Sequence, residues 1–444
     1  MKPDFYDVRT VKMTASSIIL DNQEIKETAN NFITGASIRA LINGSWGIAT
    51  TENPEHTGKA LSTATEIALS TNQKTPREKV ELAIVNQPEI KNLPAVKEDF
   101  KDIDLEEKLK LVKEIAKAAQ KPGITNVSTS YMESEVTVEY VNSEGIEASY
   151  TLPRIGFTVA AVAKQNGNYQ MARDSRFAIS GFELFAKHDA CKIASKTADI
   201  AIDLIRAKSV KGGVMPVILD SELAGVFIHE AVGHAAEADH VLEGNSVLED
   251  RLHTQIASPL VTVCDDSSMH EYGYYPFDDE GSQSGKTVLI ENGVLKSYLH
   301  NRESASKFGG TPHNARAQGY SMPIIRMSNT YVENGSTTFE EMKDEIKNGI
   351  YLIGSRGGQV NPGDGIFQFS AERGYMIENG ELTTLLKDVS LSGSILEILN
   401  NVAAVGCDLK MRSGQCGKAG QFVPVSDGSP HVLVTNTLVG GTGC

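Results

Sequence analysis

The sequence has no long apolar run and no excess of basic residues, and each absence excludes a class of protein. No stretch approaches the roughly 20 apolar residues that a membrane-spanning helix needs. The formal net charge is −15, whereas binding to nucleic acid generally requires a basic face. We therefore expect no membrane insertion and no binding of nucleic acid.

Cysteines are also few. The five in the chain are odd in number and widely scattered, so they do not suggest a disulfide framework. The residues that follow Met1 form no apolar signal core. Together these observations predict a cytoplasmic protein. The apolar content is ordinary, and a length of 444 residues favours two domains over one.

The first half of the sequence mixes helix signals with strand signals. Residues 57–70 carry apolar side chains at helical spacing, and Asp104, with a glutamate three residues later, predicts a capped second helix. Residues 124–173 alternate between apolar and polar side chains, as in a half-buried strand. The dipeptide Asn166-Gly167 within them predicts a tight hairpin turn.

A polar, glycine-containing segment over 206–213 predicts a boundary between domains, because few tertiary contacts cross such linkers. It follows a helix expected over 188–207, and we place the domains at 1–208 and 209–444. The second domain contains many short strand signals separated by glycine turns, which is typical of a barrel or a sandwich. A helix is expected there over 394–404.

The clearest chemical signal is the segment 229–239. It follows an apolar run, 214–219, that predicts a buried strand, and the acidic and hydroxyl residues after this run can cap a helix. His229, Glu230 and His234 therefore lie on one predicted helix. Zinc hydrolases place metal ligands and a general base on such a helix.

The spacing of the two histidines requires a distortion. In the familiar His-Glu-x-x-His helix the histidines are four residues apart and share one face. Here they are five apart, which separates them by roughly 140° on a helix of about 3.6 residues per turn. Both reach one metal only if the helix widens or ends between them, and Gly233 makes such a distortion easy. The alternative is a buried helix whose histidines bond to backbone, but the acidic neighbours favour a metal.

The acidic residues of the segment have distinct candidate roles. Glu230 is the natural general base, which would take a proton from water and pass it to the leaving amine. Glu237 or Asp239 could orient a ligand histidine, or be ordinary solvated acids. Spacing alone does not identify a third metal ligand, and the candidates are Glu237, Asp239, His240, Cys264, Cys407 and Cys416.

These residues, with others along nearly the whole chain, resemble the TldD/PmbA family of metallopeptidases, and in particular its TldD-type active subunit. The histidine motif with its downstream acids is similar to the family's HExxxH segment. The stretch 414–421, which contains Cys416 and is followed by Val-Pro-Val, is similar to a second signature. Further similar segments, in the family's order, are 35–50 with Arg39 and Trp46, 326–331 and 357–363.

The resemblance implies an α+β fold class, with a mixed α/β N-terminal domain and a β-rich, barrel- or sandwich-like C-terminal domain that carries the metal-binding helix. It also implies one zinc ion per chain, held by His229, His234 and Cys416, with Glu230 as the catalytic base. The expected activity is cleavage of unfolded or short peptides. A homologous partner subunit, either a paralogue or a second copy, is implied as well.

Several other residues receive expectations of their own. His313, Asn314 and Arg316 lie in a glycine-rich segment similar to a family motif, where an oxyanion or substrate contact is one hypothesis and a plain turn the other. The remaining cysteines are expected to be small buried hydrophobes, apart from the terminal one, and they are Cys191, Cys264, Cys407 and Cys444.

The rival hypothesis is a protein without catalysis. Relatives in this family have also been described as gyrase modulators, so a regulatory or interaction protein is the alternative. Such a role would not need an intact constellation for activating water, which makes the peptidase the stronger hypothesis. Measurement of bound zinc, together with a cleavage assay, separates the two.

Overall fold

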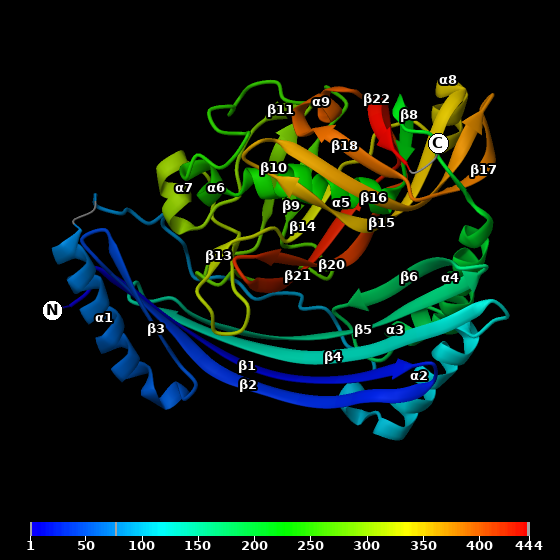
Figure 1. The fold of residues 1–444 in the computed structure, drawn as a ribbon. Helices are drawn as coiled ribbons and strands as arrows, with labels where there is room; N and C mark the ends of the chain where they lie inside the picture. The colour runs from blue at the N-terminus through cyan, green and yellow to red at the C-terminus, as the bar shows by residue number, and fades with distance from the viewer. Residues whose placement is uncertain (1, 76–77, 442–444) are drawn as a thin grey trace.

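The computed structural model describes residues 2–75 and 78–441, and its first half forms one antiparallel sheet. The strands are long and the sheet is strongly curved (Figure 1). They run in the order β3-β2-β1-β4-β5-β6. Their bounds are β1 (Phe5–Asp21), β2 (Glu24–Ile42), β3 (Ser45–Thr51), β4 (Ile124–Asn142), β5 (Glu147–Gln165) and β6 (Asn168–Ala178).

Helices cover the convex face of this sheet (Figure 1). At one end α1 (Thr57–Lys74) packs on β2 and β3, and at the other end lie α2 (Leu105–Ala119) and α4 (Ala190–Arg206). Because side chains alternate along a strand, Ile18 and Leu20 of β1 point into the core under α2 and α4. A short helix, α3 (Leu184–Lys187), precedes α4.

The second half of the chain sits against the concave face. Val11, Val138 and Tyr140 of the sheet pack there with Phe277. Next to them lies a group of buried charges, the interface charge cluster, made of Asp7, Arg39 and Glu280. Arg39 bonds to the Asp7 carboxylate and, at 2.7 Å, to Glu280. An apolar contact and an ionic contact therefore join the two halves.

The second half contains a closed five-stranded barrel. The strands pair in the circuit β15-β8-β22-β18-β16, and a further pairing of β15 with β16 closes it. Their bounds are β8 (Gly213–Leu219), β15 (Asn348–Asn361), β16 (Ile366–Glu378), β18 (Ser390–Ser394) and β22 (Val432–Gly440). Additional strands paired to the barrel are β7 (Lys208–Ser209), β17 (Glu381–Lys387) and β19 (Val402–Val405).

A second sheet lies beside the barrel, and α5 (Ser221–Ile228) contacts both. The strands of this sheet, in order, are β11 (Val294–Leu295), β10 (Lys286–Glu291), β9 (Val263–Asp266), β14 (Asn329–Val332), β21 (Gln421–Ser429) and β20 (Lys410–Lys418). The smaller elements are β12 (Ala315–Arg316), β13 (Ile324–Ile325), α6 (Ala238–Leu242), α7 (Arg302–Phe308), α8 (Phe339–Ile346) and α9 (Ile395–Asn400).

The predicted fold class is confirmed, with two local corrections. The helix expected over 394–404 ends at Asn400, because Val402–Val405 pairs with β22 as a strand instead. Asp104 does precede α2, but its side chain makes no capping hydrogen bond. The domain division at 208 stays a prediction. Within the ranges described above, no helix is long and apolar enough to cross a membrane.

Candidate metal centre

The helix that carries the histidines starts at the end of barrel strand β8. Asp220 caps it, accepting a hydrogen bond from the Leu223 amide at 2.9 Å. The same carboxylate oxygen accepts from the Gly354 amide of β15 at 3.1 Å. Leu223 and Phe227 pack into the large core of the second half. The cap and the apolar face together fix α5 between the barrel and the second sheet.

After Ile228 the helix widens into a π-type turn over His229–Gly233, followed by a tighter turn over His234–Ala236. The wide turn is the distortion that the five-residue spacing requires, and it leaves the two imidazole rings perpendicular with centroids 5.4 Å apart. Gly233 has ordinary helical angles, φ −56 and ψ −57. It is needed for space, since a Cβ there would overlap the sulfur of Met327.

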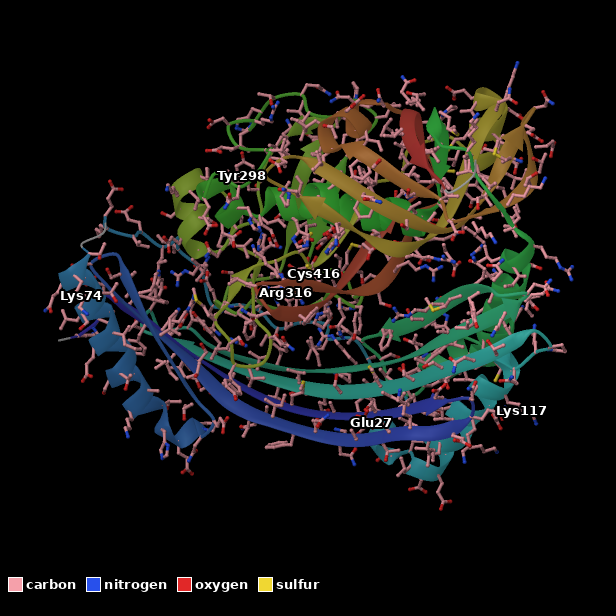
Figure 2. The ribbon with its side chains drawn as sticks, viewed as in Figure 1. Glu27, Lys74, Lys117, Tyr298, Arg316 and Cys416 are labelled. Atoms are coloured by element: carbon pink, nitrogen blue, oxygen red, sulfur yellow. The ribbon has the colours of Figure 1, made fainter. Side chains whose placement is uncertain are left out.

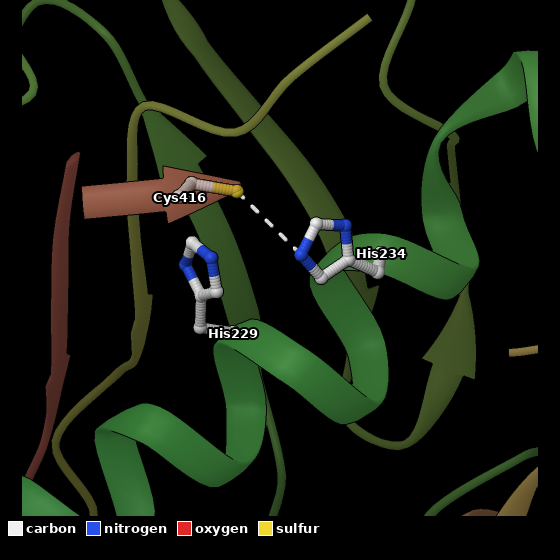
Figure 3. Close-up of side chains that lie close together, drawn as sticks. All are labelled: His229, His234 and Cys416. Carbon is white, nitrogen blue, oxygen red and sulfur yellow. Dashed lines mark hydrogen bonds between the residues drawn. The ribbon is translucent and has the colours of Figure 1, made fainter. Parts of the chain in front are cut away.

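Cys416 comes from the far end of the sequence. It lies on β20, and its Sγ is 3.5 Å from His234 Nε2 although the two residues are 182 positions apart. One ligand atom from each of His229, His234 and Cys416 lies within 4.8 Å of the others (Figure 3). His229 and Cys416 are buried, and the His234 side chain is 12% exposed. Buried Arg326 donates to the Cys416 carbonyl and anchors this point of the strand.

The electrostatics of the three groups are coupled. Burial alone would raise the pKa of the Cys416 thiol, but the neighbouring imidazoles outweigh it and lower that pKa to about 5. Burial lowers the pKa of each histidine. The Cys416 sulfur facing His229 and the Glu237 carboxylate beside His234 outweigh burial, so both pKa values are raised. The sulfur is therefore a thiolate at neutral pH, which is the form that binds metals.

Two carboxylates lie close to this group. Glu230 Oε2 is 3.7 Å from His234 Nε2, and its side chain is 31% exposed, so solvent reaches it. Asp427 is buried, and burial raises its pKa to about 6 even though His229 opposes the shift. Its Oδ2 and the Nδ1 of His229 are both buried without a hydrogen-bond partner. The sequence reasoning did not identify Asp427, and it included Arg326 only as the start of a family-like segment, without a role at this centre.

The acids downstream of the histidines form a second polar group. Glu237 is fully buried, and its Oε2 lies 3.0 Å from His234 Nδ1. Asp239 is partly exposed and bonds to Lys418 Nζ at 2.7 and 2.8 Å. Burial raises the pKa of Glu237, but His234 and Lys418 outweigh it and the pKa is lowered. Lys418 is a further residue that was missed, although it lies only two positions after Cys416 on the same strand.

The structure does not bring the glycine-rich loop residues into the three-ligand group. His313 Nδ1 lies 2.7 Å from the Gln283 carbonyl, and the Asn314 amide donates to Asp265 at 2.8 Å. Arg316 donates to the carbonyls of Met327 and Pro424 at 2.6 and 2.7 Å, near the centre of the molecule (Figure 2). These contacts support loops and strands, and roles in substrate binding stay predictions.

The other cysteines differ from one another. Cys264 is buried, with its Sγ 3.5 Å from a Glu333 oxygen, and Cys191 is half-buried on α4. Cys407 is exposed, so the expectation of a buried hydrophobe was wrong there, because the residue sits in the turn between β19 and β20. Cys444 lies outside the described residues.

The donor set fits zinc. Imidazole and thiolate are both ligand types that zinc takes, and catalytic zinc sites use three protein ligands with the remaining position left for water. The Nδ1 of His229 also fits, since it is a buried nitrogen without a hydrogen-bond partner. Soft sulfur and nitrogen donors would not suit magnesium or calcium.

Comparison with known proteins agrees with this chemistry. Residues 6–70, 98–205 and 212–441 match the three domains of the PmbA/TldA metallopeptidases, described as domain 1, the central domain and the C-terminal domain. A protein named metalloprotease from Methanothermobacter thermautotrophicus is 40% identical over 99% of this chain and 96% of its own. A zinc metalloprotease TldD homolog from Saccharolobus solfataricus is 30% identical over 98% of this chain and 96% of its own.

Two solved structures share the fold. One, from Thermotoga maritima and described as a candidate modulator of a DNA gyrase, superposes with a TM-score of 0.82 at 23% identity, covering 98% of this chain and 96% of the other. The other is TldE from Thermococcus kodakarensis, with a TM-score of 0.79 at 20% identity, covering 99% and 97%. The domain matches and the identities settle the relationship: the chain belongs to the TldD/PmbA family of metallopeptidases.

Proposed function

We propose that this chain is a zinc-dependent endopeptidase of the TldD type that cleaves unfolded or short peptides. The observation that carries the proposal is the convergence of His229, His234 and Cys416 within 4.8 Å of one another. Local sequence geometry does not hold Cys416 near the helix, since it is 182 residues from His234. The name of the Saccharolobus relative, a zinc metalloprotease, supports the choice of metal.

In this proposal His229, His234 and Cys416 hold one zinc ion per chain. When bound, zinc supplies a Lewis acid that polarises the scissile carbonyl and acidifies water. Glu230, partly exposed and 3.7 Å from His234, takes the proton of the attacking water and returns it to the leaving amine. The buried Glu237 holds His234 through Nδ1, which keeps Nε2 directed at Cys416.

The remaining candidates have supporting roles in the proposal. Asp239 contributes through Lys418 and does not touch the ligands directly. His313, Asn314 and Arg316 brace the loops around the centre through backbone and side-chain bonds, and a contact with substrate is their hypothetical further role. Substitution of His313, whose ring is half-buried, tests that role without breaking the core.

We further propose that the chain works in the cytoplasm with a homologous partner subunit. The acidic composition and sparse cysteines support the compartment. The likeness to a protein named TldE supports a partner of the same fold. Purification of the tagged chain from its native cell, followed by mass determination of the intact complex, distinguishes a paralogue from a second copy.

The central test combines metal analysis with a single substitution. Purified wild-type protein should contain about one zinc per chain and cleave a labelled unstructured peptide. Glu230→Gln should keep the zinc and lose cleavage by about 10²- to 10⁴-fold, since it removes general-base catalysis. Glu243→Gln, at an exposed acid in the same region, is the matched control and should behave as wild type.

Two results would contradict the peptidase. If the zinc-free protein folds and melts as the zinc-loaded protein does, the proposed metal centre is wrong. Undiminished cleavage by Glu230→Gln would remove the proposed base. Protein that binds no zinc and cuts no peptide would favour the alternative of a regulatory protein of the gyrase-modulator type.

A further inference from the structure

Lys418 lies between the two acids that follow the histidine motif. Its ammonium Nζ contacts both oxygens of Asp239, at 2.7 and 2.8 Å, and Glu237 Oε2 at 3.1 Å. A fourth contact, at 3.1 Å, goes to the carbonyl of Ile325. The Lys418 side chain is only 12% exposed and that of Glu237 is fully buried. The ammonium therefore has a complete set of oxygen partners in a largely dry site.

These acids do not form a second metal site. Ligand atoms of Glu237, Asp239 and His240 do lie within 4.8 Å of one another. The Lys418 ammonium already occupies the position next to both carboxylates, and a divalent cation there would have to displace it. The positive charge that this acidic group needs is supplied by the chain itself.

The contacts of Lys418 close a ring around one metal ligand. Glu237 Oε2 contacts Lys418 on one side and, at 3.0 Å, His234 Nδ1 on the other. His234 Nε2 in turn lies 3.5 Å from Cys416 Sγ. Cys416 and Lys418 are two positions apart on β20, so their side chains leave the strand on the same side. The ring of contacts thus runs from Lys418 on β20 to Glu237, then to His234, and back to β20 at Cys416.

We propose that Lys418 is a positioning residue of the metal centre: its ammonium fixes the Glu237 carboxylate against His234 Nδ1 and ties that pair to the strand that carries Cys416. This inference rests on the proposed zinc peptidase. Partners that orient a ligand histidine typically change metal affinity or activity by about 10- to 100-fold when they are removed. Lys418 contacts Glu237 and not His234 itself, so its effect on the ligand histidine is indirect.

The test measures zinc affinity by competition with a metal indicator, alongside kcat and KM. Lys418→Met removes the ammonium and keeps the length of the side chain, Lys418→Arg keeps a charge, and Lys410→Met is the control at an exposed lysine of the same strand. We expect Lys418→Met to weaken zinc binding by about 10-fold or more and to lower kcat. Lys418→Arg should recover much of both, and Lys410→Met should match wild type.

A double variant keeps the test decisive if Lys418→Met fails to fold with Glu237 left uncompensated. In the Glu237→Gln background no buried carboxylate needs the ammonium, so adding Lys418→Met should change zinc affinity much less than it does in wild type. Equal losses in both backgrounds, or wild-type affinity in Lys418→Met, would overturn the inference while the zinc peptidase stands. Wild-type protein without zinc affinity would overturn both.

Discussion

Charged groups are buried in the interface charge cluster and at the proposed metal centre, and the two regions differ in how those charges are neutralised. In the interface charge cluster each buried carboxylate meets a guanidinium, because Arg39 contacts both Asp7 and Glu280. At the metal centre the facing groups are two imidazoles and a thiolate, all of which offer lone pairs to the same point. The first region is compensated within the chain, and the second has the composition of a cation site.

The comparison shows that buried charge alone does not indicate a ligand. The pairs in the interface charge cluster join β1 and β2 to a loop of the second half, so their effect is on how the halves hold together. The donors at the metal centre are soft, converge from two remote segments, and include an imidazole nitrogen without a partner. The type and convergence of the donors distinguish the functional site.

The largest effect on stability is expected from breaking the interface charge cluster. Arg39→Met would leave the carboxylates of Asp7 and Glu280 buried without their cation, which typically costs about 3–5 kcal/mol. Chemical denaturation should report this loss, with zinc affinity of the folded protein unchanged. Lys12→Met, at an exposed ion pair of the same sheet, should change stability by less than about 1 kcal/mol. If Arg39→Met lost as little stability as Lys12→Met, the buried carboxylates of the interface charge cluster would not depend on Arg39 for compensation.

The next effect should depend on zinc. Cys416→Ser should lose most of the bound zinc and all Glu230-dependent cleavage, together with the stabilisation that the metal provides. That stabilisation is about 4 kcal/mol when free zinc is 1,000 times its Kd. Melting curves with zinc and with a chelator should differ for wild type and coincide for Cys416→Ser. Cys407→Ser, at an exposed cysteine, should retain the difference.

One pattern would show that the ligand set is wrong. If Cys416→Ser kept metal and activity while Glu237→Gln lost both, then Glu237 would be a ligand in place of the cysteine. His234 and Glu237 are three residues apart and already in contact at 3.0 Å, so the same helix end would then supply two ligands.

A smaller effect should come from a buried histidine that has no opposing charge. His300 is 2% exposed, its Nδ1 lies 3.1 Å from the Ser304 hydroxyl, and burial, aided by His313, lowers its pKa from 6.5 to about 4. The unfolded chain then takes up the proton first as pH falls, so stability present above pH 6.5 is lost between pH 6.5 and 4. The pKa difference of 2.5 (6.5 − 4) corresponds to a free energy of at most about 3–4 kcal/mol.

His300→Gln should flatten this part of the pH–stability profile, measured by denaturation at fixed ionic strength. His56→Gln, at an exposed histidine, should leave the slope unchanged. If His300→Gln kept the wild-type slope of stability against pH, the buried His300 ring would not govern acid sensitivity. Burying an imidazole without an opposing charge would then cost less stability than expected.

The sequence predicted what depends on local spacing. The five-position spacing of His229 and His234 demanded a widened helix, and the wide turn is present. Asn166-Gly167 makes the expected hairpin, with φ 50 and φ 81. The β-rich second half was expected as a barrel or sandwich, and five of its strands close into a barrel.

The spacing of residues in the sequence could not predict contacts between residues far apart in the chain. Cys416 entered the ligand set through the family resemblance, since several other residues satisfied the spacing equally well. Arg39 and Glu280 are 241 positions apart, and no local pattern pairs them. Lys418 carried a usable signal, because the residue two positions after a proposed ligand on a strand shares its side, but its acidic partners come from another element.

The distance in sequence between the ligands also orders events during synthesis. At about 5–20 residues per second, the ribosome makes Cys416 roughly 9–36 s after His234, because the two are 182 positions apart. The barrel that supports α5 closes later still, when β22 (Val432–Gly440) pairs with β8 and β18. Throughout that interval the nascent chain contains His229, Glu230 and His234 but lacks the Cys416 thiolate, so the proposed metal centre is complete only after nearly the whole polypeptide has been made.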